Sequence, residues 1–339
     1  MTKLTAVGEY VKALKPLLPA HAFEPARSRL FWLPVHLAIA TLCIVAIGSG
    51  ALPWPLYPLI SLVIGGSFAG LVFLGHETLH GAVVRSRYPR YLVGFVTFLP
   101  FVVSPRLWVA WHNRVHHGNA NCAGMDPDAY PTLEEHQSSL GVRIVTDWFA
   151  VGRRRWIGLA LLAVGFSVQS LHVLLIAGRR GYLKPRQHAL ALAETALGCA
   201  CWLALAFVLG PPFVFACLLP WLLANAIVMS YILTNHALSP LTQVNDPLAN
   251  SLSVTVPPLV EFLTLRFGFH VEHHLFPWMS SRHAPLVRDL VRERWPERYQ
   301  SMTLVAALKA VHRTPRVYAN DTTLVDPRTG ETAAALSPR

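Results

Sequence analysis

Five long apolar segments constrain the fold of this chain more than any other feature of its sequence. Each has roughly the length that an α-helix needs to cross the hydrocarbon core of a bilayer, about 20 residues. Only 14% of the residues are charged, whereas a soluble domain has about 25%, so we expect lipid to be the solvent for much of the chain. The apolar segments are residues 30–52, 59–75, 157–178, 189–209 and 213–234.

The positions of arginine and lysine predict how these segments are oriented. The turns at residues 50–55 and 210–212 carry no charge, whereas several other connections are basic. Because short cytoplasmic loops are enriched in lysine and arginine, we expect the uncharged turns outside and the basic stretches in the cytoplasm. The first two and the last two segments then form two hairpins. The basic stretches are the N-terminus, 85–90, 153–155, 179–186 and the region after residue 281.

Two apolar segments are expected to lie in or along the membrane without crossing it. Residues 91–103 are too few to span and end near Pro105. Residues 157–178 have basic flanks at both ends, so a single crossing would place one flank outside, although their length also permits a full span. The sequence thus predicts an all-α integral membrane protein with four transmembrane helices and a helical cytosolic cap. Its parts are a cytosolic N-terminal segment (1–29), a membrane domain (30–312) and a polar, loosely ordered C-terminal tail (313–339).

Histidine is the unusual residue type here, because nine of the 16 histidines fall in four clusters. The clusters are HETLH at 76–80, HNRVHH at 112–117, Asn235-His236, and HVEHH at 270–274. Residues three or four positions apart share one face of a helix, so each multi-histidine cluster is expected to present its imidazoles in one direction. The charge-based topology places all four clusters on the cytoplasmic side. The nine residues are His76, His80, His112, His116, His117, His236, His270, His273 and His274.

Nine imidazoles are too many for one metal ion. A structural zinc ion takes four ligands and a catalytic zinc ion takes three, whereas two ions with four or five nitrogen ligands each use this number well. Imidazole suits zinc, iron, copper and nickel, and iron is the natural candidate for oxygen chemistry because zinc cannot change its redox state. Residues 76–80 also match the HExxH motif of zinc hydrolases, but that alternative leaves the other clusters without a role.

The order HxxxH, HxxxHH and HxxHH resembles the three histidine boxes of membrane fatty acid desaturases. The third box continues as HVEHHLFP at 270–277, which is similar to the family's HxxHHLFP, and the resemblance covers roughly residues 30–300. It implies four transmembrane helices capped by a cytosolic domain, with a di-iron centre bound by the eight box histidines. His236 matches a further iron ligand of the family, and Asn235 is a poorer match to an asparagine that reaches iron through water. The second box departs from the commoner HxxHH.

Acidic and aromatic residues near the boxes are candidates for supporting roles. The carboxylates are candidates to orient the imidazoles by hydrogen bonds, with a solvated or helix-capping acid as the alternative for each. The aromatic residues are candidates to line the channel for the acyl chain, with an interfacial aromatic belt as the alternative. The carboxylates are Glu77, Asp126, Asp128, Asp246 and Glu272, and the aromatic residues are Trp108, Trp111, Phe267 and Phe269.

The resemblance implies an O2-dependent desaturase that introduces a C=C bond into a fatty acyl chain with two external electrons. The sequence has no flavin or nucleotide motif and no HPGG motif of a cytochrome b5-like module, so a separate ferredoxin-like or cytochrome-like donor is implied. The acyl carrier stays open between lipid, coenzyme A and carrier protein. The net charge of +11 lies beside apolar segments, so we expect membrane lipids as partners and no nucleic acid. The expected location is a bacterial inner membrane, with the active site and both termini in the cytoplasm.

Two other functions remain open on the sequence. A di-iron hydroxylase or ketolase acting on a lipid or carotenoid shares every box, and only the mass of the product separates it from a desaturase. A non-catalytic metal-binding or transport protein predicts polar residues along a path through the membrane. Glu194 is the main residue of that kind within the apolar segments.

Overall fold

The computed structural model describes residues 3–153 and 155–336, and it is mostly helical, with 65% of the chain in helices. Arg154, part of one predicted basic stretch, lies outside the described residues, as do the two first residues and the last three of the expected tail. The chain forms two compact units. The first unit contains residues 1–24, 112–162 and 230–339, and the second unit contains residues 25–111 and 163–229.

The second unit is built on long apolar helices. Among the described residues, four helices are long and apolar enough to cross a membrane, namely Arg27–Gly48, Trp54–Leu79, Pro185–Leu209 and Val214–His236, and the four segments expected to span overlap them. The coarse prediction of a mostly helical membrane protein is therefore confirmed. The elements that begin in this unit are η3 (Arg27–Phe31), α2 (Trp32–Gly48), η4 (Trp54–Leu56), α3 (Tyr57–Leu79), α4 (Arg87–Phe98), η5 (Leu99–Phe101), α5 (Pro105–Trp108), η6 (Val109–His116), α10 (Gly165–Ile176), α11 (Pro185–Leu209), η8 (Val214–Leu218) and α12 (Leu219–His236).

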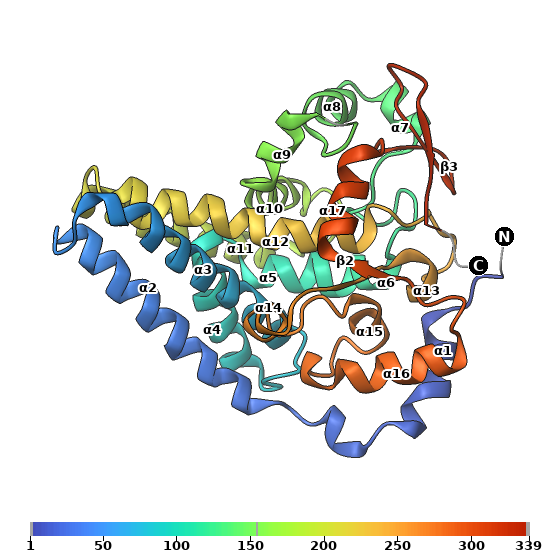
Figure 1. Cartoon of the computed structure of the whole chain (residues 1–339), viewed down its shortest axis with the longest axis horizontal. Coiled ribbons are helices and arrows are strands. Elements are labelled where there is room, and N and C mark those ends of the chain that lie inside the picture. Colours follow the sequence, from blue (N-terminus) through green and yellow to red (C-terminus); the bar gives the residue numbers. More distant parts are fainter. Residues whose placement is uncertain (1–2, 154, 337–339) are drawn as a thin grey trace. The chain divides into compact units, whose positions relative to one another are not determined.

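Helix α3 packs closely on its neighbours through small residues. It lies beside α2 (Figure 1), where Gly70 leaves room for the ring of His36. Gly75 lies against Thr97 and Phe98 of α4 so closely that a Cβ atom there would overlap their side chains. Small residues let membrane helices approach at short range, because lipid provides no hydrophobic force between them. The C-terminal end of α3 is thus held on two sides.

Both apolar segments that are expected not to cross the membrane belong to broken helices. The chain bends by 105° between Arg87–Phe101 and Pro105–Asn119, and Val102 at the bend has a left-handed φ of 60°. Residues 157–178 form α9 (Trp156–Leu162) and α10, with a break between them. Each pair fits a broken span or a re-entrant segment, so the expectation that neither crosses the membrane stays a prediction.

The first unit has a core around the third histidine cluster. Helix α15 packs with α1 and α16, through buried residues such as Tyr10, Val271 and Val287. The further elements of this unit are α1 (Val7–Leu14), η1 (Lys15–Leu17), η2 (Ala20–Phe23), α6 (His117–Asn119), α7 (Leu133–Ser138), α8 (Leu140–Ile144), η7 (Val145–Phe149), α9, α13 (Pro247–Asn250), β1 (Ser253–Thr255), α14 (Pro258–Leu263), α15 (His270–Leu275), η9 (Ser281–His283), α16 (Ala284–Arg294), β2 (Ser301–Thr303), α17 (Leu304–Arg313), β3 (Val317–Asn320), β4 (Thr323–Val325) and β5 (Thr332–Ala334).

The C-terminal residues differ from the sequence-based expectation of a loosely ordered tail. After α17 they form an antiparallel sheet in the order β3-β4-β5 (Figure 1), while β1 and β2 pair in parallel elsewhere in the unit. Tyr318 and Leu324 are buried against Leu241, and the backbone N–H of Tyr318 donates to Pro131. The polar composition suggested disorder, but two buried side chains and backbone pairing are enough to order strands of three or four residues.

Candidate metal centre

The first histidine box lies at the end of α3, in the second unit. The helix continues beyond its apolar run through His76, and His80 follows its last residue with the backbone still in the right-handed helical region. The N–H of His80 donates to the carbonyl of His76, and the two rings lie 4.7 Å apart between their centroids. The spacing of four residues thus places both imidazoles on one side of the helix end.

The second box lies on a π-helix, η6, and not on the α-helix that its spacing suggested. In an α-helix each residue turns by about 100°, so His117 would point about 140° away from His112, five residues earlier. Hydrogen bonds in a π-helix run from i to i+5, which brings the fifth residue back over the first. His112 accordingly stacks on His116, with ring centroids 5.1 Å apart, and its Nε2 lies 3.2 Å from Nε2 of His117. The extra residue of HxxxHH is absorbed by the wider turn.

The third box reaches the same arrangement on a regular α-helix. His270 begins α15, and its ring lies 5.8 Å from that of His273 and 4.6 Å from that of His274. Spacings of three and four residues place side chains on one face of an α-helix. The second box thus has the spacing HxxxHH on a π-helix, and the third box has the spacing HxxHH on an α-helix. Both boxes present three imidazoles together.

His236, the one candidate ligand outside the boxes, ends α12 and lies among histidines of the second and third boxes. Its Nδ1–H donates to the carbonyl of Asn250 at 2.9 Å, which leaves Nε2 available as a metal ligand. That Nε2 lies 2.7 Å from Nε2 of His270. The structure therefore brings together residues from the ends of α12 and α15, as the sequence predicted.

Four buried histidines of the first unit form a group that fits a metal ion. One nitrogen from each ring lies within 4.8 Å of one nitrogen of every other, and the residues are His116, His236, His270 and His274. Burial, and then the neighbouring imidazoles, hold the pKa of His274 well below its ordinary value, so it stays in the neutral form that binds metals. Neither ring nitrogen of His274 has a hydrogen-bond partner among the described residues. A buried polar atom without a partner is unfavourable, and a metal ion would accept its lone pair.

Asn235 contributes another observation that fits a metal site. Its side chain is fully buried, and neither its Oδ1 nor its Nδ2 has a partner in the described part of the chain. The backbone carbonyl of the same residue accepts from the N–H of Leu252, so the position is ordered. An amide in this state needs a polar neighbour, for which a metal-bound water is suitable. The sequence-based role for Asn235 remains a proposal.

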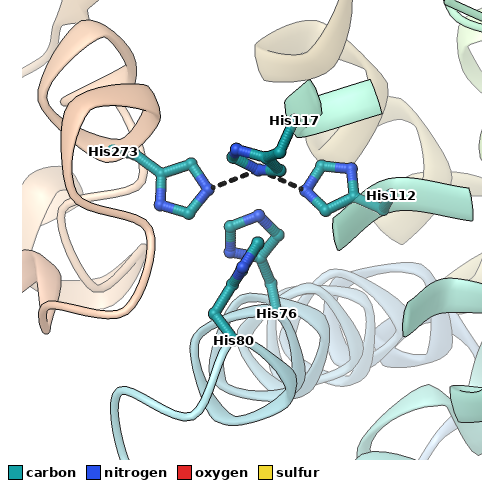
Figure 2. Close-up of side chains that lie close together, drawn as sticks. All are labelled: His76, His80, His112, His117 and His273. Carbon is teal, nitrogen blue, oxygen red and sulfur yellow. Dashed lines mark hydrogen bonds between the residues drawn. The ribbon is translucent and has the colours of Figure 1, made fainter. Parts of the chain in front are cut away.

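Three further histidines of the first unit converge in a second group. Nε2 of His117 lies 3.2 Å from Nε2 of His112 and 3.1 Å from Nε2 of His273, as the dashed lines in Figure 2 show. Figure 2 also shows His76 and His80 projecting together from the end of α3. Three imidazole nitrogens at such short separations from one another are a set of donors that suits a second metal ion.

The carboxylate of Asp126 faces His116, one of the candidate ligands. Its two oxygens lie 3.0 and 3.1 Å from Nδ1 of His116, and Oδ2 of Asp128 lies 3.5 Å from the same nitrogen. A carboxylate that accepts from Nδ1–H fixes the ring orientation and leaves Nε2 for the metal. Asp126 itself is buried, and it accepts from the backbone N–H of Asn121 and of Asp128.

The other acidic candidates have different partners. Glu77, in the second unit, lies 3.6 Å from Arg29. Glu272 accepts from Ser253 at 2.7 Å and from Tyr299 at 2.6 Å, and burial raises its pKa. Among the described residues, no histidine ring is a hydrogen-bond partner of Glu272. Its bonds attach α15 to β1 and to the segment after α16.

Asp246 also departs from the role considered for it. Its fully buried carboxylate pairs with Arg298 at 2.6 Å and accepts from Tyr10 and from the backbone of Thr5. It also caps α13 through the N–H of Leu248. Within the described residues these partners include no imidazole. The contacts join the N-terminal helix to the rest of the first unit, which is a structural role.

The four aromatic candidates lie in different surroundings. Trp108 is buried beside Trp111 in the second unit, and its ring centroid lies 5.8 Å from that of His76. In the first unit, Phe267 lies 6.4 Å from His270, and Phe269 lies under the guanidinium of Arg288 at 5.2 Å. The contact with arginine makes Phe269 the least suited of these to line an acyl channel. That any of them lines such a channel remains a prediction.

Three asparagines near the histidines had no signal in the sequence. Asn245 donates to the backbone carbonyl of His117, Asn250 accepts from His236, and Asn121 donates to the backbone carbonyl of His236. None lies within a histidine box, and each contact joins residues more than ten positions apart. Only Asn121 had a local clue in hindsight, since asparagine favours the left-handed backbone region in which it lies.

Comparisons with known proteins agree with this chemistry. The model of the family described as fatty acid desaturase matches residues 52–306. The sn-1 oleoyl-lipid 12-desaturase of Arthrospira platensis is 23% identical over 280 residues, which cover 78% of this chain and 77% of the relative. The chloroplastic omega-6 fatty acid desaturase of Spinacia oleracea is 22% identical over 291 residues, covering 83% of this chain and 63% of the relative.

A third relative adds a named electron donor. The sn-1 acyl-lipid omega-3 desaturase (ferredoxin) of Synechocystis sp. is 28% identical over 133 residues, or 38% of this chain and 36% of the relative. None of these three names supports a hydroxylase, a ketolase or a non-catalytic metal-binding protein. The family model covers most of the chain, including the three histidine boxes. The chain therefore belongs to the fatty acid desaturase family, a family of oxidoreductases that act on fatty acyl chains.

Proposed function

We propose that the chain introduces a C=C bond into the acyl chain of a membrane lipid, using O2, two external electrons and two iron ions. The observation that carries the proposal is the buried group of four histidines from three separate segments of the first unit. The curated relatives support the substrate class, since two of those described above are named as desaturases of lipid-linked acyl groups.

The nine histidines divide into two ligand sets. One set is the group of four, His116, His236, His270 and His274. The other is built on His112, His117 and His273, to which we assign His76 and His80 because three nitrogens alone would leave the second ion with fewer ligands than the first. When bound, the iron ions supply the oxidising chemistry that an alkyl chain requires, because it offers no acid, base or leaving group.

The chain's own residues hold the ligands in a fixed tautomer. Asp126 accepts from Nδ1–H of His116, and the carbonyl of Asn250 accepts from Nδ1–H of His236. In both rings Nε2 is then directed to the metal, with the geometry set before the metal binds. Despite its burial, the Asp126 carboxylate raises the pKa of His116 to about 9, so a metal ion that binds Nε2 of this ring displaces a proton.

An apolar cavity in the second unit is suited to hydrocarbon. It has a volume of about 310 Å³ and is lined by residues such as Phe101, Val102, Leu107, Thr195 and Cys199. Pockets of roughly 300–1,000 Å³ with mostly apolar walls are typical of sites for small apolar ligands. We propose that this cavity receives part of the acyl chain and holds it away from water.

An aromatic cluster lies beside that cavity. The ring of Phe101 lies 5.3 Å from Phe166, which lies 5.8 Å from Trp108, and Trp108 in turn contacts His76. All of these rings belong to the second unit. Within that unit, aromatic side chains thus connect the cavity wall to the first histidine box, and they provide rigid apolar surface against which a chain can be positioned.

The electron donor is proposed from chemistry and from one relative's name. The omega-3 relative is named with ferredoxin as its donor. The segment from η9 to the end of α16 carries several arginines, and a basic surface steers an acidic partner to the correct face. The arginines are Arg282, Arg288, Arg292 and Arg294. We therefore propose a ferredoxin-like donor, and a bacterial inner membrane with the boxes on its cytoplasmic side.

Expression in a host with a known fatty acid composition tests the proposal. We expect acyl chains two hydrogens lighter than their precursors, and about two iron ions per purified chain. The His274→Ala variant should lose both the product and much of the iron. The matched control is His172→Ala, because His172 is exposed on α10 and belongs to neither ligand set. Products with added oxygen, or one zinc ion per chain, would refute the proposed function.

A further inference from the structure

Asn121 contacts the end of α12, which carries His236, and the loop whose Asp126 faces His116, so it is linked to two of the three segments that supply the group of four. It lies between α6 and the loop that carries Asp126, and it is only 2% exposed. Its backbone N–H donates to Asp126 at 2.8 Å. Its side-chain Nδ2 donates to the carbonyl of His236 at 3.2 Å and to that of Pro240 at 3.1 Å. One residue thus bonds to the end of α12 and to the loop after the second box.

The two contacts act on two different ligands. Asp126 orients His116 through Nδ1, and the N–H of Asn121 is one of the donors that hold the Asp126 carboxylate. On the other side, the amide of Asn121 holds the backbone of His236 itself. The rings of His116 and His236 lie 4.8 Å apart. The separation of these two ligands therefore depends on a residue that is not itself a ligand.

A neighbouring contact strengthens the same junction. The side chain of Asn250 donates to the carbonyl of Ala120 at 2.8 Å. The backbone carbonyl of Asn250 accepts from Nδ1–H of His236. The carbonyl of Asn121 accepts from the N–H of Thr242 at 3.0 Å. The backbone carbonyls of Ala120 and Asn121 are therefore both held to the stretch of chain that follows α12.

Asparagine is one of few residues that satisfies all these contacts. The backbone of Asn121 has a φ of 52°, a region that glycine, asparagine and aspartate tolerate better than other residues. The two carbonyl oxygens require donors, which an amide has and a carboxylate lacks. Glycine would keep the backbone but provides no side-chain donor. The position thus requires both the conformation and the amide.

We infer that Asn121 is a positioning residue that sets the spacing of His116 and His236, and hence the metal affinity of the four-histidine site. This inference rests on the proposed function, because it assumes two metal sites per chain. Contacts that orient ligands typically change metal affinity by about 10–100-fold when they are removed. The second group contains neither His116 nor His236, so the effect is specific to one site.

The Asn121→Gly variant tests the inference. Glycine keeps the left-handed backbone and the N–H donor to Asp126, and it removes only the amide. Metal content should be measured by elemental analysis while the purified protein is dialysed against a chelator of increasing strength. We expect the wild type to lose both ions together at high chelator strength, and the variant to lose one ion at about 10–100-fold lower strength while keeping the other.

Two further variants separate positioning from folding. Asn119→Gly is the matched control, because Asn119 is the last residue of α6, two positions before Asn121, and among the described residues its side chain bonds only the carbonyl of Val115. Asn121→Asp keeps the size of the side chain but places a carboxylate against two carbonyl oxygens. The four-histidine site should therefore bind its ion more weakly than in Asn121→Gly. The unfolding midpoint of the metal-free protein should change by a similar amount in Asn119→Gly and Asn121→Gly.

The outcomes distinguish this inference from the proposed function. A wild type that binds fewer than two ions per chain contradicts the proposed function. A wild type with two ions, together with unchanged affinity in Asn121→Gly or equal weakening of both sites, overturns the inference alone. If Asn121→Gly proves unstable, the Asn121→Asp variant decides, since unchanged or equally weakened sites in that variant overturn the inference as well.

Discussion

Deleting Arg114 should convert the second histidine box from a π-helix to an α-helix without destroying the metal site. Arg114 is one of the three residues between His112 and His116, and its side chain is exposed. A π-turn contains one residue more than an α-turn, so the removal of one residue allows regular i to i+4 hydrogen bonds. The box would then read HxxHH, like the third box.

The geometry gives the expected size of the change. Each residue of an α-helix turns by about 100° around the helix axis. The residues three and four positions after a histidine therefore point about 60° to one side of its direction and about 40° to the other side. The third box has this spacing on α15, with ring separations of 5.8 and 4.6 Å from His270. The shortened second box should reach similar separations. We therefore expect two ions per chain and activity within about tenfold of the wild type, a change of about 1.4 kcal/mol or less in the barrier.

Two controls separate the number of residues from the identity of the side chain. Arg114→Ala keeps the number of residues and should leave metal content unchanged. Insertion of one alanine after Val271 lengthens the third box on an α-helix that has no wider turn, so His273 and His274 should rotate by about 100°. That variant should lose metal, whereas the shortened second box keeps it. Metal per chain and the fatty acid profile of the host provide the two measurements.

Loss of metal on deletion of Arg114, to the extent seen when a ligand is removed, would contradict this role of the π-helix. A Δ114 protein as poor in metal as His116→Ala would mean that the wider turn does not compensate for the extra residue. The same conclusion would follow if the lengthened third box kept both metal ions. Unchanged helicity by circular dichroism is needed in each variant, because a misfolded first unit would also lose metal.

Three other perturbations test separate parts of the structure. Asp126→Asn should weaken metal binding by about 10–100-fold, because it removes the carboxylate that orients His116. Asp128→Asn should have a smaller effect, because the nearest oxygen of Asp128 is 3.5 Å from Nδ1 of that ring. Equal metal titrations for the two variants would contradict this. Cys199→Trp should fill part of the cavity in the second unit. Turnover of longer acyl chains should then fall by about tenfold or more relative to shorter ones. An unchanged product distribution would refute the role of the cavity. Asp246→Ala should lower the free energy of unfolding by about 3–5 kcal/mol, because it leaves the Arg298 guanidinium without its carboxylate. Denaturant titration in detergent measures this change. A loss below about 1 kcal/mol would show that the pair contributes little.

The long helices could be predicted because length and the absence of charge decide them. A segment of about 20 apolar residues has few alternatives to a helix in lipid, where every backbone group needs an internal partner. The four segments predicted to span accordingly overlap long apolar helices. The type of helix at the second box could not be predicted, since HNRVHH has no local feature that distinguishes a π-turn from an α-turn.

The acidic residues show why contacts with the histidines were harder to predict. Asp126 and Asp246 each follow a candidate ligand, His116 or His236, by ten residues. Asp126 turns back to His116 because the chain reverses at Asn121, in the left-handed region. Asp246 instead meets Arg298, which is 52 residues away in sequence. Separation along the chain is the same in both cases, and only the packed fold decides which carboxylate reaches an imidazole.

The buried polar atoms of the first unit are the strongest physical argument that the histidines hold metal. The four histidines of the group are buried, and both nitrogens of His274 and both polar atoms of Asn235 lack hydrogen-bond partners among the described residues. Each buried polar group without a partner costs about 1–3 kcal/mol, which is a large fraction of the stability of a domain. A purely structural core would replace such residues by apolar ones at no loss. Because metal binding supplies the missing partners, the fold of this unit and its occupation by metal ions should be thermodynamically linked, so that removal of the ions destabilises the unit that contains them.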